Sequence, residues 1–67
     1  MITDKEEHTS DKGVATINTH KGERFPFEYA KPEIFYSAFI QLKNGVAWTF
    51  YTTDYRHALR GVMQNLH

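Results

Sequence analysis

The sequence contains no cysteine, so neither a disulfide nor a thiolate-bound metal can hold this fold together. No apolar run approaches the roughly 20 residues that cross a bilayer. The first seven residues are polar and acidic, which is unlike a signal peptide. These absences predict a cytoplasmic protein that does not contact a membrane.

The chain also lacks an excess of charge of either sign. Eight basic and eight acidic side chains give a formal net charge of zero. Affinity for nucleic acid comes largely from cations that neutralise phosphates. The balance therefore argues against non-specific binding of DNA or RNA, although it leaves room for a local basic patch.

Motifs of catalysis, metal binding and cofactor binding are missing as well. His8, His20, His57 and His67 do not have the spacing of metal ligands on a helix, and surface histidine is the simpler interpretation. The four glycines are isolated, so there is no phosphate-binding loop. Nothing resembles a nucleophile elbow, and a chain this small rarely closes a dry active site. We predict a protein that is not an enzyme and needs no cofactor.

What the sequence does contain is a short chain rich in aromatic residues. Its 67 residues are enough for one domain only. A chain of this size buries about 60% of its unfolded surface, so its core contributes little net stability. Small domains without disulfides or structural metals often gain stability by forming oligomers or by binding a partner. We therefore expect a homodimer or a partner-bound domain.

Residues 1–12 are almost entirely polar, and Ile2 is their one large aliphatic side chain. Burial of this segment cannot offset the entropy lost on ordering it. We predict a flexible polar tail over 1–12 and a single small α+β domain over 13–67.

The domain begins with two stretches typical of strands. Residues 14–19 are rich in β-branched side chains, and residues 24–29 alternate aromatic with other residues. Between them, 20–23 includes Gly22, which can take a positive φ. This pattern predicts a first hairpin.

A second hairpin is predicted over 35–52, because Asn44-Gly45 separates two apolar runs. With a two-residue turn, both faces of this hairpin would be apolar, and a small chain can hardly cover both. With a bulge at Gly45, Ile40 pairs with Trp48 and one face alone is continuously apolar. We prefer the bulged register, and the two-residue turn remains the alternative.

An amphipathic helix is predicted over 54–66, capped by Thr52 or Thr53. Apolar side chains at helical spacing form the face that should pack on the sheet: Tyr55, Ala58, Leu59, Val62, Met63 and Leu66. Gly61 lies at the edge of the polar face, where a close neighbour would explain it. The expected fold is an antiparallel sheet of about four strands with this helix on one face. The expected core is Trp48, Phe50, Ile40, Leu42, Leu59, Val62 and Tyr55.

The other face of the second hairpin mixes aromatic and uncharged polar side chains. Three uses are open: packing against the rest of the chain, contact with another protein, or stacking of single-stranded nucleic acid. Arginines on the outer helix face could assist the last of these. The candidate partner-binding residues are Phe35, Ser37, Phe39, Gln41, Tyr51, Arg56 and Arg60.

The leading functional hypothesis is a non-enzymatic interaction module that binds and modulates, most simply inhibits, a larger macromolecule by covering its surface. Very short cysteine-free domains of this kind are common among phage and mobile-element proteins. The alternative hypothesis is a small nucleic-acid-binding domain that uses the sheet face and the basic helix face.

Overall fold

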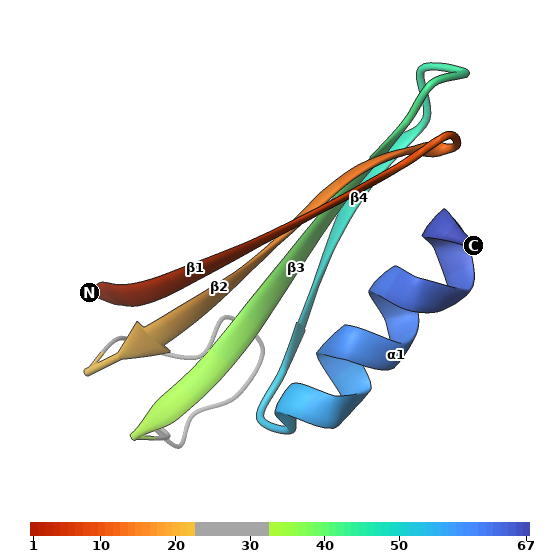
Figure 1. Cartoon of the computed structure of the whole chain (residues 1–67). Helices are drawn as coiled ribbons and strands as arrows, with labels where there is room; N and C mark the ends of the chain where they lie inside the picture. Colours follow the sequence, from red (N-terminus) through yellow and green to blue (C-terminus); the bar gives the residue numbers. More distant parts are fainter. Residues whose placement is uncertain (23–32) are drawn as a thin grey trace.

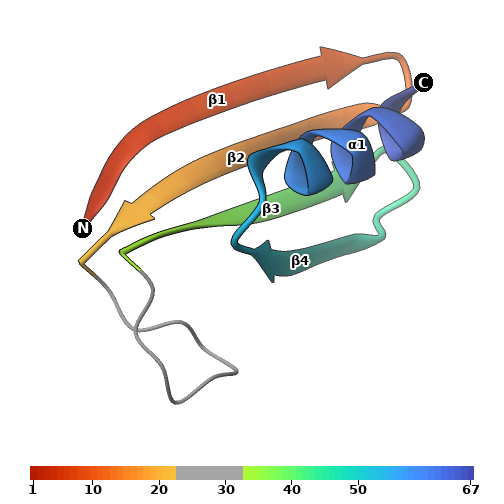
Figure 2. The same ribbon diagram turned by 90° about the horizontal axis from the view of Figure 1, so that it is seen from below.

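A computed structural model describes residues 1–22 and 33–67. Four strands, β1 (Ile2–Ser10), β2 (Gly13–Lys21), β3 (Ile34–Leu42) and β4 (Ala47–Thr52), precede one helix, α1 (Tyr55–Leu66). The strands form one antiparallel sheet in the order β1-β2-β3-β4. The helix lies across one face of this sheet (Figures 1 and 2). The predicted α+β class and the packing of a C-terminal helix are confirmed.

The predicted flexible tail over 1–12 is wrong, because residues 2–10 form β1. None of its side chains is fully buried, as the composition requires. The strand is ordered through its backbone, which pairs along β2 from Ser10, opposite Gly13, to Ile2, opposite His20. Backbone pairing depends little on side-chain identity. The edge of β2 therefore orders residues 2–10, whose low hydrophobicity does not predict a strand.

The predicted strand over 14–19 is confirmed as part of β2, but its place in the sheet differs from the expectation. Both of its edges are occupied, by β1 on one side and β3 on the other. The second strand of the predicted first hairpin, 24–29, lies outside the described residues.

The hairpin of β3 and β4 has the bulged register. Ile40 pairs with Trp48, the Leu42 amide donates to Val46 O at 2.8 Å, and the Gly45 amide donates to Leu42 O at 3.0 Å. Gly45 has a φ of +93°, a conformation that glycine takes without steric cost. The Asn44 side chain accepts from the Val46 amide and braces the turn.

The core lies between the sheet and α1, and small residues on both sides allow close approach. The buried cluster consists of Ala15, Ile17, Ala38, Ile40, Ala58, Val62 and Leu66. Larger side chains are partly buried around it: Tyr36, Leu42, Trp48, Phe50, Tyr55 and Leu59. All seven residues of the predicted core pack here, but most of them lie at its margin.

Two details of the helix differ from the expectation. Asp54 itself is the N-cap, since its side chain accepts from the Arg56 amide at 3.0 Å, while Thr52 Oγ1 accepts from the Asp54 amide. Met63, assigned to the buried face, is 37% exposed. Gly61 is explained by a neighbour: a Cβ there would stand 2.6 Å from the Phe50 ring.

Candidate interaction surface

The sheet face that points away from α1 carries most of the predicted contact residues. The register places Phe39 between Thr16 of β2 and Thr49 of β4, and Gln41 between Val14 and Ala47. Cross-strand partners point to the same side of a sheet. The side chains of this face therefore come from all four strands.

One end of this face is closed. Phe35 is 2% exposed and Ser37 is 7% exposed. The Phe35 ring stacks on His20 with centroids 4.5 Å apart and planes 2° apart, and His20 Nε2 lies 2.8 Å from Ser37 Oγ. The Tyr51 ring is half-buried at 6.4 Å from Phe35. Phe35 and Ser37 are thus buried, which agrees with packing, the first of the three uses left open for this face.

The opposite end, next to the two hairpin turns, is open. Val14 is 46% exposed and Phe39 is 41% exposed, so two large apolar side chains stand in water. Their immediate partners on this face are uncharged, and Glu7 of β1 and Lys43 of the β3–β4 turn lie at its border. We call this set the open patch: Thr9, Val14, Phe39, Gln41, Ala47 and Thr49, all exposed.

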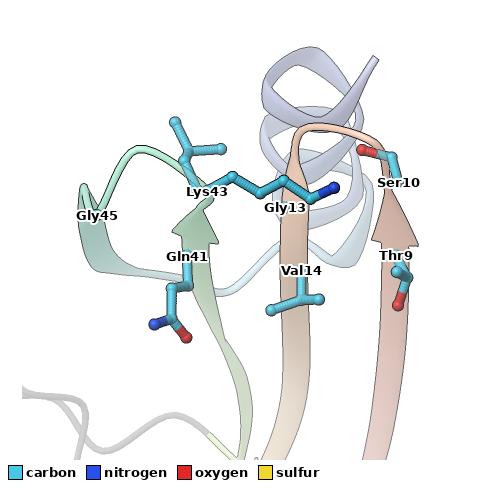
Figure 3. Close-up of a pocket in the computed structure, with 8 residues that line it drawn as sticks. Thr9, Ser10, Gly13, Val14, Gln41, Lys43 and Gly45 are labelled. Carbon is cyan, nitrogen blue, oxygen red and sulfur yellow. The ribbon is translucent and has the colours of Figure 1, made fainter.

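A shallow hollow of about 420 Å³ lies at the turn end of the open patch. Figure 3 shows the Thr9, Val14 and Gln41 side chains on neighbouring strands beside it, with Lys43 reaching across from the β3–β4 turn. The hollow is wide open to solvent, so it does not exclude water as an active site does. Its shape suits a protruding side chain of a partner better than an enclosed small molecule.

Among the described residues, the charged side chains of this face lie at its margins. On β1, Lys5 Nζ and Glu7 Oε1 approach to 3.8 Å while both side chains remain exposed. Lys43 is exposed in the turn. Within the part of the chain that the structure describes, this face has no row of cations that could follow a phosphate backbone.

The helix arginines are separated from the sheet residues. Arg56 and Arg60 are exposed on α1, whereas Ala58 and Val62 bury the inner side of the helix against the sheet. The sheet therefore stands between these arginines and the open patch. Phe39 and Gln41 stay together on one surface, but a single flat ligand cannot touch them and both arginines.

A polar cluster that sequence reasoning missed joins β1 to the helix. Tyr55 Oη donates to Glu6 Oε1 at 2.5 Å, and His8 Nε2 contacts Glu6 Oε2. The Tyr55 hydrogen bond, and then that of His8, lower the pKa of Glu6. The same Tyr55–Glu6 bond raises the pKa of Tyr55 to about 12. The spacing of Glu6 and His8 would have placed them on one face if 2–10 had been recognised as a strand.

No group of three or more acidic or histidine side chains in residues 1–22 and 33–67 is arranged to hold a metal ion. In the same residues, no helix has the length and apolar character required to cross a membrane. Comparison of the chain with protein-family models, with curated proteins and with solved structures found no match.

Proposed function

We propose that this chain is a non-enzymatic interaction module that binds a larger protein through the open patch and inhibits it by covering part of its surface. The observation that carries this proposal is the exposure of Val14 and Phe39, diagonal neighbours on β2 and β3, beside the uncharged polar side chains of Gln41 and Thr49. Interface centres are depleted of charge and enriched in aromatic side chains.

The chemistry of the patch favours a protein over a nucleic acid. Single-strand binders stack successive bases on several exposed rings and lead the backbone along a basic groove. Among the described residues of this face, Phe35 is buried, Phe39 is the one exposed ring, and Lys5 is offset by Glu7. A single-stranded nucleic acid is the second candidate ligand of this face, and the capture experiment described below can detect it.

Covering a surface also suits a chain of this size. A hydrogen-bonded sheet holds side chains in fixed positions, so little ordering entropy is lost on binding. The open hollow beside Val14 and Gln41 offers a place for one anchoring side chain of the partner. Inhibition would then follow from blocked access and requires no chemistry by this chain.

The test is capture of partners from a lysate of the native host, with two matched pairs of variants. Val14→Asp places a charge in the patch, and its control Val46→Asp places the same charge at a 51% exposed valine in the β3–β4 turn. Phe39→Asp is matched by Met63→Asp on the helix. We expect a protein that is retained by the parent and both controls, and lost with both patch variants.

The partner found in this way is then titrated with each purified variant. Val14→Asp and Phe39→Asp should each weaken binding by at least about tenfold, since each truncates an apolar contact and buries a charge. Equal binding by patch and control variants would refute the assignment of the patch. Capture of nucleic acid in a complex that weakens steeply with salt would favour the second candidate.

A further inference from the structure

The two edges of the sheet differ in their chemistry. β1 carries charged side chains along its length, and its register shifts between Ile2 and Asp4. Both features are ways in which proteins prevent an edge strand from pairing with another chain. β4 reads Ala-Trp-Thr-Phe-Tyr-Thr, without charge, proline or a register shift against β3. Among the residues that the structure describes, the β4 edge is therefore the one without these protective features.

The outer backbone groups of β4 follow from its register with β3. In an antiparallel ladder, hydrogen-bonded pairs alternate with pairs whose amide and carbonyl groups point outward. Because the Leu42 amide donates to Val46 O, the bonded pairs continue through Ile40–Trp48. The backbone groups of Thr49 therefore point away from β3. Among the described residues, β4 pairs with β3 only.

The helix side of this edge is also incompletely covered. Trp48 and Phe50 are only partly buried against the core, at the margin of the area that α1 covers. A neighbouring strand would bring further apolar surface against both rings. Large aromatic side chains contribute strongly to interfaces of this kind.

We propose that two copies of this chain pair antiparallel along β4, with a two-fold axis perpendicular to the sheet at Thr49. Thr49 of each copy would exchange backbone hydrogen bonds with Thr49 of the other. Trp48 would then lie beside Phe50 of the second copy on the helix side. An antiparallel edge is complementary to itself, and β4 has no charge to repel its own copy.

This arrangement joins the two sheets into one and keeps both helices on the same side. The two open patches then lie together on the other side. Ala47 and Thr49 belong both to the open patch and to β4, but the dimer uses the backbone edge of β4, whereas the proposed function is tested at Val14 and Phe39, which lie on other strands. If the chain proves to be a monomer, the edge pairing is wrong but the open patch can still bind a partner protein. If the chain forms the dimer but binds no partner protein, the proposed function is wrong but the edge pairing stands.

The test is sedimentation equilibrium of the full chain and of single-site variants. The parent chain, of 7.9 kDa, should sediment with twice that mass. Thr49→Lys and Thr49→Glu each place like charges opposite one another at the axis, so each should be monomeric alone. Mixed in equal amounts they should form a heterodimer, because the two charges now attract. This rescue also shows that both variants fold.

Thr49→Pro provides a second, independent variant. It removes an outward amide that β3 does not use, and proline is tolerated at such edge positions. The loss of two symmetric hydrogen bonds should raise the dimer dissociation constant at least about tenfold. Thr9→Lys is the matched control on the β1 edge and should remain dimeric.

Three results would overturn the proposal. These are a monomeric parent at concentrations of about 100 μM, well above a micromolar dissociation constant; a dimeric Thr49→Lys variant; and separate monomers in the equal mixture of Thr49→Lys and Thr49→Glu. Circular dichroism of each variant, compared with the parent, accompanies every mass measurement.

Discussion

Tyr55 and Glu6 are 49 positions apart in the chain, and the Tyr55 hydroxyl donates to Glu6 Oε1 at 2.5 Å. The bond connects the first turn of α1 to the middle of β1, an edge strand that buries no side chain completely. The Tyr55 ring also meets Tyr36 of β3 edge-on at 5.5 Å. One side chain therefore ties the outermost strand and the centre of the sheet to the helix.

Removal of the Tyr55 hydroxyl should weaken the attachment of β1. Tyr55→Phe keeps the ring contact with Tyr36 but removes the donor to Glu6 Oε1, while His8 still contacts Glu6 Oε2. Because Glu6 stays partly exposed and can bind water, we expect a loss of about 1 kcal/mol in the free energy of unfolding. Urea denaturation measures this value, and Tyr36→Phe, which also removes one tyrosine hydroxyl, is the control. An unchanged midpoint for Tyr55→Phe would show that the bond does not contribute.

Acid should release the same contact. The folded-state pKa of Glu6 is lowered below its ordinary value of 4.5, so its contribution to stability is complete above that value. It is lost as the pH falls through the lower folded-state pKa. Glu6→Gln should therefore be less stable than the parent at neutral pH, and the difference should shrink in acid. Urea denaturation over a pH series measures this; a constant difference would contradict it.

At alkaline pH, the Tyr55–Glu6 hydrogen bond should be detected through the ionisation of Tyr55. Its pKa is raised to about 12 because the neutral hydroxyl donates to the Glu6 carboxylate. The contribution of this bond to stability is present below the ordinary pKa of 10.0 and is lost as the pH rises through about 12. The near-ultraviolet absorbance of phenolate reports the titration. In Glu6→Gln, Tyr55 should ionise at a lower pH than in the parent, because the hydrogen bond to the carboxylate is lost.

Gly61 should resist replacement although it lies within a helix. Alanine is intrinsically favoured there by about 1 kcal/mol, but its Cβ would stand 2.6 Å from Phe50 Cζ. Overpacking of this kind costs about 1–3 kcal/mol, so we expect Gly61→Ala to be destabilising. In a Phe50→Leu background the same change should become neutral or stabilising. A double-mutant cycle by thermal unfolding tests the coupling, and additive effects would exclude it.

The N-cap assignment can be checked by two neighbouring substitutions. Asp54→Ala removes the acceptor of the Arg56 amide and should cost about 1 kcal/mol. Thr53→Ala, at the position expected to cap the helix from sequence, should cost less than half as much. Chemical denaturation compares the two variants. Equal losses of stability in the two variants would mean that Asp54 and Thr53 both contribute to the cap.

The sequence alone determined the elements whose signals are local. Asn44-Gly45 and the alternation around it predict the bulged hairpin, since one register leaves a single face apolar and the other leaves two. The spacing of Ala58 and Val62 likewise predicts the buried side of α1. These patterns are read within a few residues, where backbone geometry and side-chain direction are coupled directly.

Only the tertiary structure decided which residues of the candidate surface are accessible and how 2–10 is ordered. Phe35 and Phe39 lie four residues apart on the same side of β3, yet one is 2% exposed and the other 41% exposed. Alternation assigns a face but cannot say how far a distant segment covers it. β1 was missed for a related reason, because its order comes from hydrogen bonds to β2 and from Tyr55. Both interactions are non-local and leave little trace in hydrophobicity.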